Sequence, residues 1–422
     1  MNTPAVDGSI STISTDEAIA LHRAHLSKGR SQLAAMFGSL VEQSASGARV
    51  TTTDGQEFLN CGGYGVFFTG AGHPRIVAAV KEQLEKQALS TRLFLDPVVG
   101  LAAQALTSVA PAGLDRVHFA GSGTEATETA IKLARAHGKR RLISTENGYH
   151  GKTIGALSLT AKSFYQDPFR PLLPDVEHIP FGDTAALAAA LASGDGEACV
   201  VLEPVQSEAG VIVPPPGYLK EVAALCREHN AFLVVDEVMT GLGRLGAWWG
   251  CDLAEVRPDV LLIGKALSGG VVPVSAALAT PEAFAPFDAD PFLHTSTYSG
   301  APIAMAAARA TVEVIRDEHL VDRAAETGAR LLAALRAIAA DRAPHLVREV
   351  RGAGLLIGVE LVDASQAGEL LLELVDRHVV VNHSLNAHPV VRFTPPAVIT
   401  PDEETQLLEA VDGALSAMAK KF

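Results

Sequence analysis

The segment Asp259-Val-Leu-Leu-Ile-Gly-Lys-Ala-Leu-Ser-Gly-Gly270 places Lys265 directly after a short apolar run and between glycines. The run predicts a buried strand at Val260–Gly264, so a solvated surface charge is poorly placed at its end. Burial lowers the pKa of an ammonium group and prepares the amine to act as a nucleophile and as a proton shuttle. A lysine that merely extends its charged head from the strand end into solvent is the simpler alternative.

The preceding apolar run, Ala231–Asp236, ends in Val234-Val-Asp-Glu-Val238. Open α/β sheets bind their ligands outside the carboxyl ends of the strands, which is where Asp236 falls. Asp236 and Lys265 lie far enough apart for a helix to cross between them, so both are expected at one sheet edge. Asp236 then either pairs with a cationic ring nitrogen or caps the following turn.

The surrounding pattern predicts an α/β fold with a mostly parallel sheet flanked by helices, because continuous apolar strands alternate with amphipathic helices. The other expected strands are Arg116–Ala120, Arg141–Ser144 and Ala198–Glu203, and the expected helices include Thr124–His137 and Tyr218–His229.

A third element is Gly121-Ser-Gly-Thr-Glu125, which follows a strand and opens a helix. Free backbone N–H groups at a helix N-terminus bind phosphate, although an ordinary helix cap has the same sequence. A phosphate site, an acid for a ring nitrogen and a buried lysine together are what a pyridoxal-phosphate (PLP) enzyme requires. Tyr149, in Asn147-Gly-Tyr-His-Gly-Lys152, is the candidate aromatic residue to cover the cofactor ring.

The chain length of 422 residues predicts more than one domain. We expect residues 1–65 to be an N-terminal segment that joins the small domain, residues 66–300 to be a large PLP-binding domain, and residues 301–422 to be the small domain. Within the last part, a helical region from Ala301 to about Arg342 precedes strands near Leu355–Leu361 and Val390–Thr394 and a helix from Pro401.

The formal net charge of −14 argues against a nucleic-acid partner. No apolar run reaches the length that a membrane helix needs, and no signal peptide is recognisable, so we expect a cytoplasmic protein. The four cysteines lack the spacing of a zinc site or a disulfide framework, and no metal is expected.

In this combination the chain resembles the class III (ω-amino group) aminotransferases of PLP fold type I, from about residue 45 to the C-terminus. The matching stretches are Gly121–Ala130, Tyr149-His-Gly151, Glu203-Pro-Val-Gln-Ser-Glu-Ala-Gly210, Asp236-Glu-Val238, Lys265 and His294-Thr-Ser-Thr-Tyr298. The resemblance implies that Lys265 holds PLP as a Schiff base and that Asp236 grips its pyridine nitrogen.

Further cofactor contacts are implied by the same resemblance. The backbone of Gly123 and Thr124 is expected to bind the phosphate, with the Ser122 hydroxyl near it. Thr297 is expected to reach the phosphate of the neighbouring subunit, which implies a homodimer. The remaining expectations are Tyr149 and Val238 on the two ring faces, Glu203 behind the cofactor, and Met239 in place of a glutamine that binds the phenolic oxygen.

For the substrate, Arg392 in Val391-Arg-Phe-Thr-Pro-Pro396 matches the arginine that clamps an α-carboxylate. Glu208 matches the glutamate that pairs with this arginine when no carboxylate is bound. Without the resemblance, a surface arginine on a strand would be the favoured interpretation of Arg392.

Within the class, the runs Gly151–Lys162, Pro168–Pro174, Pro214–Tyr218 and Pro291–His294 look like those of putrescine (diamine) aminotransferases. This implies ping-pong transfer from a terminal amine to a 2-oxo acid such as 2-oxoglutarate, or the reverse onto a biosynthetic aldehyde. Met239 is shared with glutamate-1-semialdehyde aminomutases, so an aminomutase is the alternative. Gly121 is a further departure, because the family has Asn at this position. A non-catalytic binding protein on the same fold is the remote third possibility.

Overall fold

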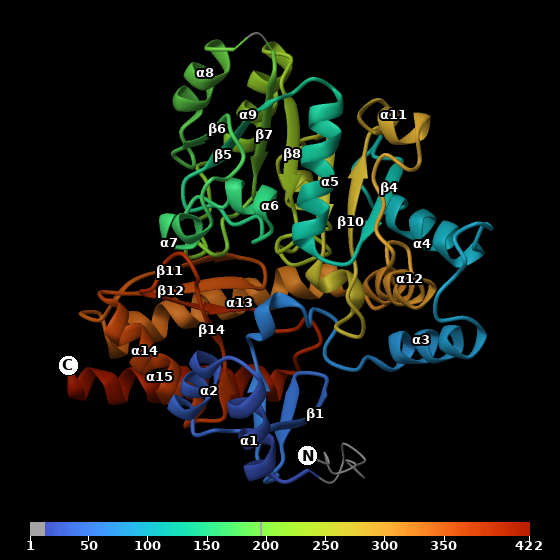
Figure 1. The fold of residues 1–422 in the computed structure, drawn as a ribbon. Coiled ribbons are helices and arrows are strands. Elements are labelled where there is room, and N and C mark those ends of the chain that lie inside the picture. The colour runs from blue at the N-terminus through green and yellow to red at the C-terminus, as the bar shows by residue number, and fades with distance from the viewer. Residues whose placement is uncertain (1–12, 195) are drawn as a thin grey trace.

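The computed structural model describes residues 13–194 and 196–422, and its largest sheet has seven strands in the order β4-β10-β9-β8-β7-β5-β6 (Figure 1). In that order the strands are Arg116–Ala120, Ser275–Ala279, Val260–Ile263, Phe232–Asp236, Ala198–Leu202, Arg141–Thr145 and Val176–Ile179. Strands β9, β8, β7, β5 and β6 are parallel, whereas β10 is antiparallel to both of its neighbours. The predicted α/β class with a mostly parallel sheet is confirmed.

The sheet is apolar on both faces because helices cover both. Alternate residues of β7 belong to different apolar clusters, with Val200 and Leu202 in one and Cys199 and Val201 in the other. This arrangement explains why β7 is buried along its whole length and reads as a continuous apolar run. The helices of this part are α5 Gly123–Ala136, α6 Ile154–Leu159, α7 Ser163–Gln166, α8 Thr184–Ala192, α9 Tyr218–Glu228, α10 Gly250–Leu253 and α11 Pro281–Ala289.

The large sheet contains two strands that the sequence did not reveal, β6 and β10. Strand β10 reads Ser-Ala-Ala-Leu-Ala, which is too short and too rich in small residues to give a clear strand pattern. The other five strands were predicted to within about one residue.

A second sheet of four strands, β11-β12-β15-β14, comes from the C-terminal part of the chain. Its strands are Val347–Ala353, Leu356–Leu361, Val390–Phe393 and Asn382–His383, and they pair antiparallel. Helices α13 Leu320–Arg342, α14 Ala364–Val375 and α15 Pro401–Lys421 belong to the same part (Figure 1). The long predicted helical region is two helices, because His319 has a φ of 52° and separates α12 Pro302–Asp317 from α13.

A third sheet, β1-β2-β3-β13, joins strands from the N-terminal part of the described chain to a short strand from its C-terminal part. Its strands are Glu42–Ser46, Arg49–Thr52, Glu57–Asn60 and Val379–Val380, and β13 pairs parallel to β3. Helices α1 Thr15–His25 and α2 Lys28–Met36 precede this sheet and bury no residue. The first twelve residues of the predicted N-terminal segment lie outside the described part of the chain.

Along the sequence, strand β3 of the third sheet is followed by the 3₁₀ turn Gly63–Gly65 and by helices α3 Pro74–Lys86 and α4 Pro97–Thr107, before the large sheet begins with β4. Both helices pack on α12, which ties this stretch to the large sheet. Among the helices that the structure describes, none combines the length and apolarity needed to cross a membrane.

Candidate active site

The carboxyl ends of β8 and β9 bring the two central residues together. Asp236 is the last residue of β8 and pairs in register with Leu262 of the parallel strand β9, and Lys265 follows the end of β9. One pocket at this edge is lined by eight of the residues predicted from the sequence, namely Gly123, Thr124, Tyr149, Glu203, Asp236, Val238, Met239 and Lys265. The expectation that Asp236 and Lys265 share one sheet edge agrees with this geometry.

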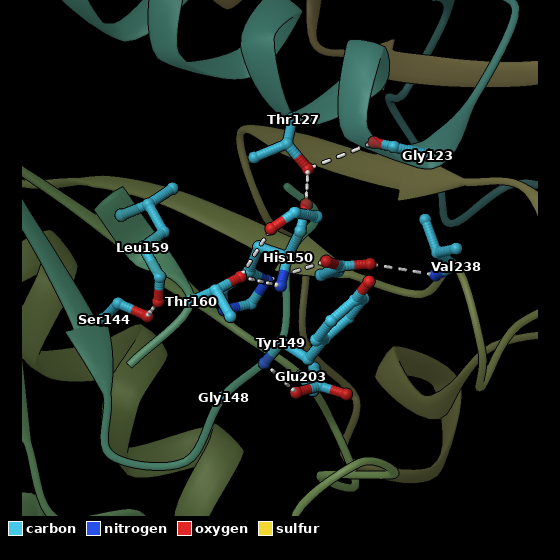
Figure 2. A network of polar contacts seen from close by, with 12 residues as sticks. Gly123, Thr127, Ser144, Gly148, Tyr149, His150, Leu159, Thr160, Glu203 and Val238 are labelled. Atoms are coloured by element: carbon cyan, nitrogen blue, oxygen red, sulfur yellow. Dashed lines mark hydrogen bonds and ion pairs between the residues drawn. The ribbon is translucent and has the colours of Figure 1, made fainter. Parts of the chain in front are cut away.

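Asp236 is held on both sides of its carboxylate. Its Oδ2 lies 2.7 Å from Nδ1 of His150, and its Oδ1 accepts a hydrogen bond from the backbone N–H of Val238 at 3.0 Å. Figure 2 shows the network around His150, in which the Thr160 hydroxyl accepts from the His150 backbone N–H. Burial alone would lower the pKa of His150, but the hydrogen bond and charge of Asp236 outweigh burial and raise it.

Glu203 lines the same pocket, and no cation from the part of the chain that the structure describes pairs with it directly. Its carboxylate accepts hydrogen bonds from the backbone N–H groups of Tyr149 and Ser207, at 3.1 and 3.2 Å. Burial, and then the neighbouring charge of Asp236, raise the pKa of Glu203 to about 7 despite the opposing charge of His150. Glu203 therefore fixes the backbone of Tyr149, whose ring lines the pocket (Figure 2).

Lys265 is half-buried and begins a short 3₁₀ turn, Lys265–Ser268. Its φ of 41° is sparsely populated for a residue with a side chain, and such backbone conformations concentrate at functional sites. Burial lowers the pKa of the Lys265 amine, which favours the neutral, nucleophilic form. The nearby carboxylates of Glu208 and Asp236 oppose this effect only in part.

The N-terminus of α5 provides backbone donors beside the lysine. Gly123 is the first residue of α5, so its N–H and those of the next residues have no partner within the helix. The Thr124 hydroxyl is engaged with Thr153 at 2.8 Å, and the Ser122 hydroxyl donates to Glu125 at 3.2 Å. A Cβ at Gly123 would lie 3.0 Å from Cγ1 of Val238, so glycine permits the close approach of these two segments.

Arg392 and Glu208 form a buried ion pair with an Nη1–Oε1 distance of 2.7 Å. Glu208 also accepts from the backbone N–H of Leu385 at 2.9 Å, and Arg392 Nη1 donates to the Ser207 hydroxyl at 3.3 Å. Although burial alone raises the pKa of Glu208, the charge of Arg392 outweighs it and the net pKa is lowered. Among the described residues, Nε and Nη2 of Arg392 have no hydrogen-bond partner.

Four predicted site residues, Ser122, Glu208, Arg392 and Thr297, do not line the pocket around Lys265. Ser122 lines a neighbouring pocket together with Lys265, whereas Thr297 lines neither. Thr297 lies exposed between α11 and α12. The expectation that Thr297 serves a neighbouring subunit concerns a second chain and stays a prediction. Met239 does line the pocket, and its Sδ would lie 2.6 Å from a Cβ at Gly65.

The sequence did not assign roles to His150, Lys152 or Ser207, although all three line the pocket. His150 stands in the quoted motif Tyr149-His-Gly151, but its partner Asp236 lies 86 residues away. Lys152 is exposed, and its Nζ lies 3.8 Å from the ring centroid of Tyr165. Only the folded arrangement identifies these neighbours.

The groups in the pocket fit pyridoxal phosphate. An amine of lowered pKa, a buried carboxylate and the free N–H groups of a helix N-terminus match the aldehyde, the ring nitrogen and the phosphate of this cofactor. The unpartnered Nε and Nη2 of Arg392 match a carboxylate brought by a substrate. The fold and the site thus define an α/β enzyme of the pyridoxal-phosphate type.

Comparison with known proteins narrows this class to a family. Residues 33–415 match the model of the family described as aminotransferase class-III. The structure also resembles the ornithine aminotransferase from Toxoplasma gondii, with 33% identity, a TM-score of 0.89 and coverage of 97% of both chains. The chain therefore belongs to the class-III aminotransferase family, and it is an aminotransferase.

Two other solved structures are similar. The acetylornithine aminotransferase from Elizabethkingia anophelis is 32% identical, with a TM-score of 0.82 and coverage of 96% of this chain and 99% of that one. An amine transaminase from an uncultivated Pseudomonas species, solved in its PLP-bound form, is 30% identical, with a TM-score of 0.83 and coverage of 90% and 95%. The predicted family is thus confirmed at the level of class III.

Proposed function

We propose that this aminotransferase moves an amino group from a terminal amine, a diamine or ω-amino compound, to a 2-oxo acid such as 2-oxoglutarate by a ping-pong mechanism. The reverse direction, amination of a biosynthetic aldehyde, uses the same residues. Pyridoxal phosphate is its cofactor, and when bound it supplies an aldehyde for the amino group and a cationic ring that accepts electrons. Each remaining step of the chemistry falls to the protein's own groups.

Lys265, Asp236 and the N-terminus of α5 divide this work. The Nζ of Lys265 holds the cofactor between turnovers and then moves the proton that leaves the substrate carbon. The carboxylate of Asp236, steadied by His150, keeps the ring nitrogen protonated. The backbone of Gly123 and Thr124 anchors the phosphate, and the pocket between Tyr149 and Val238 encloses the ring.

The observation that carries the proposal is the buried Arg392–Glu208 pair. A terminal amine brings no carboxylate next to its reacting carbon, so Glu208 neutralises Arg392 while the amine reacts. A 2-oxo acid does bring one, and it can replace Glu208 on a guanidinium that already has unpartnered Nε and Nη2 groups. One site can therefore take both kinds of substrate in turn.

Two observations favour an ω-amino acid over a diamine as the amine donor. Lys152 is an exposed cation at the pocket, and it would repel the second ammonium of a diamine but attract a distal carboxylate. Two of the similar proteins are named for ornithine and acetylornithine. The resemblance to putrescine aminotransferases favours the diamine instead, so both are included in the test.

An aminomutase of the glutamate-1-semialdehyde type is the second candidate, favoured by the buried Met239 in the pocket wall. An aminomutase needs no separate oxo acid, because donor and acceptor are one molecule. The transaminase needs both an amine and a 2-oxo acid for repeated turnover.

The test is the absorption spectrum of the purified protein and of Lys265→Ala, recorded with ornithine or putrescine and then with 2-oxoglutarate. We expect the band of lysine-bound cofactor to shift with amine and to return with oxo acid, and we expect Lys265→Ala to lack it. A band that no terminal amine shifts would refute the proposed donor class. Turnover without any oxo acid would favour the aminomutase.

We further propose a homodimer in which Thr297 completes the neighbour's phosphate site. The support is an exposed apolar surface formed by the apolar side chains of two segments, Leu93–Leu95 and Phe292–Tyr298. Arg92 donates to the carbonyl of Ser296 and thereby joins these segments. Leu95 is 102% exposed and Phe292 is 83% exposed, and exposed apolar groups of this size commonly mark protein interfaces.

A further inference from the structure

Arg244 is a buried cation outside the groups assigned above. It lies in the turn Gly241-Leu-Gly-Arg244, between β8 and α10, and its side chain is 1% exposed. In the described residues 13–194 and 196–422, its guanidinium forms no ion pair with a carboxylate. An unpaired buried charge is costly to a fold, so its retention calls for a physical explanation.

The Arg244 guanidinium is bound instead by carbonyl groups from three separate segments. Nη1 donates to the carbonyl of Pro395 at 2.7 Å and to that of Leu355 at 3.3 Å, and Nη2 donates to that of Gly65 at 3.2 Å. The backbone N–H of Leu355 in turn donates to the carbonyl of Arg244 at 2.9 Å. One face of the guanidinium lies 5.1 Å from the ring centroid of Phe68, which adds a cation–π contact.

Two of these segments adjoin residues assigned to the active site. A Cβ at Gly65 would lie 2.6 Å from Sδ of Met239 and 3.9 Å from Cδ of Lys265, so the Gly65 turn lies against the cofactor lysine. Pro395 lies just beyond the end of β15, the strand that carries Arg392. Arg244 therefore connects the turn at Lys265 with the strand that carries the carboxylate-binding guanidinium.

The charge of Arg244 also reaches Arg392. Burial, and then the like charge of Arg392, lower the pKa of Arg244 to about 9, so the guanidinium stays protonated at neutral pH. Both arginines are almost completely buried, and Glu208 is the carboxylate that pairs directly with Arg392. When Glu208 leaves, two buried cations remain near each other, and their combined potential favours an incoming anion.

We infer that Arg244 is a positioning and specificity residue for the carboxylate substrate. It fixes Pro395, next to the strand that carries Arg392, and the Gly65 turn, next to Lys265, and its charge adds to that of Arg392. This favours a 2-oxo acid over an uncharged carbonyl compound. The inference rests on the proposed transaminase function, because it concerns the half-reaction that consumes the oxo acid.

The experiment compares wild type with Arg244→Met and Arg244→Lys, each reconstituted with pyridoxamine phosphate. Glutarate, a dicarboxylate without a reactive carbonyl, serves as the probe, and its Kd is measured by calorimetry. We expect Arg244→Met to bind glutarate about tenfold more weakly, as the loss of one buried charge implies. Arg244→Lys keeps the charge and should recover part of this affinity. When the same variants are instead reconstituted with pyridoxal phosphate, their single-turnover reaction with ornithine should stay within about threefold of wild type.

Arg336→Met is the matched control, because the exposed Arg336 also donates to a backbone carbonyl, that of Val350 at 2.9 Å. It should leave the Kd of glutarate unchanged. Equal losses of glutarate binding and of the amine reaction, together with a lowered Tm, would reduce Arg244 to a structural role. Unchanged glutarate binding in Arg244→Met, or no binding in wild type, would also overturn the inference.

A failure of the proposed transaminase function can be told apart from a failure of this inference by measuring the wild-type protein alone. In that case the wild-type holoenzyme reacts with no terminal amine, while the glutarate comparison still measures the effect of Arg244. If Arg244→Met does not fold, Arg244→Lys carries the comparison, because it preserves the buried charge.

Discussion

The imidazole Nδ1 of His150 lies 2.7 Å from Oδ2 of Asp236, and both side chains are buried. The backbone N–H of Val238 holds the other carboxylate oxygen, so Asp236 is fixed before any cofactor binds. Among the described residues, Nε2 of His150 has no partner, which leaves Asp236 as the group that orients the ring. His150 thus positions the residue that is proposed to grip the cofactor nitrogen.

We expect His150→Phe to weaken the binding of pyridoxal phosphate by about tenfold or more. Loss of a hydrogen bond to a charged group costs about 1.5–3 kcal/mol, and Asp236 would lose the partner that orients its carboxylate. His150→Asn, which keeps a donor, should lose less. The measurement is an absorbance titration of the cofactor-free protein with pyridoxal phosphate.

His137→Gln is the control for that titration, because His137 is exposed and hydrogen-bonds the carbonyl of Ala283 instead of a site residue. Its affinity for the cofactor should equal that of wild type. Unchanged affinity in His150→Phe would show that the Asp236 carboxylate does not depend on the imidazole.

Glu203 predicts a pH dependence of stability. Its folded-state pKa is raised from 4.5 to about 7, so the folded protein keeps a proton that the unfolded chain has lost in this range. The associated stability is fully present below pH 4.5 and falls by up to about 3 kcal/mol as the pH rises through the folded-state value. Glu203→Gln should remove this part of the decline.

Urea unfolding of the cofactor-free wild type and Glu203→Gln between pH 5 and 8 measures the difference. Relative to wild type, the variant should gain stability from pH 5 to about pH 7, and the difference should then level off toward pH 8. Parallel pH profiles would mean that Glu203 is ionised in the folded protein. Any decline left in the variant above about pH 6.5 has the sign expected for His150, whose folded-state pKa is also raised.

The local sequence was sufficient to predict those site residues that lie at or just after the end of a strand of the large sheet. Asp236 and Lys265 each follow an apolar run, and parallel pairing of β8 with β9 places both at one edge. The first turn of α5 was likewise predictable, because glycine and small polar residues follow a strand there. In these cases the covalent neighbours of a residue determine where it lies.

The remaining features depend on contacts between distant segments. The pairing of His150 with Asp236 spans 86 residues, and that of Arg244 with Pro395 spans 151. A histidine after a tyrosine and an arginine in a glycine turn carry no local sign of such partners. Strand β10 was missed for a different reason, because its small residues gain their strand character from the neighbours β4 and β9.

Removing the charge of Glu125 is expected to change cofactor affinity and stability in opposite directions. Its carboxylate accepts hydrogen bonds from the backbone N–H of Gly121 at 2.8 Å and from the Ser122 hydroxyl, beside the proposed phosphate site. A Cβ at Gly121 would lie 2.8 Å from Oε2 of Glu125, so glycine at this position makes room for the carboxylate. The negative charge opposes a bound phosphate but favours the helix N-terminus.

We therefore expect Glu125→Gln to bind pyridoxal phosphate a few-fold more tightly than wild type. The cofactor-free variant should be less stable by about 0.3–1 kcal/mol, the usual contribution of an acid in the first helical turn. Asp183→Asn, which removes a carboxylate charge at the N-terminus of α8, should lower stability by a similar amount without changing cofactor affinity. Weaker cofactor binding in Glu125→Gln would mean that Glu125 orients Ser122 for the phosphate rather than competing with it.

The exposed apolar surface predicts how the chain assembles. Sedimentation should give twice the chain mass of 44.1 kDa, and Leu95→Asp should shift the protein toward the monomer. Leu253 is also exposed but lies on α10, outside the surface formed by Leu93–Leu95 and Phe292–Tyr298, so Leu253→Asp is the control. A monomeric wild type would remove the basis for any role of Thr297 in a second subunit.

Thr297 allows a direct test of a shared site. Thr297→Ala should bind pyridoxal phosphate about tenfold more weakly, since one hydrogen bond to a charged phosphate is lost. Lys265→Ala should be inactive by itself. If Thr297 serves the neighbouring subunit, refolding the two variants together restores native sites in mixed dimers, at roughly a quarter of the wild-type number by random pairing. If Thr297 serves its own chain, each mixed dimer carries both defects separately, and no native site is restored.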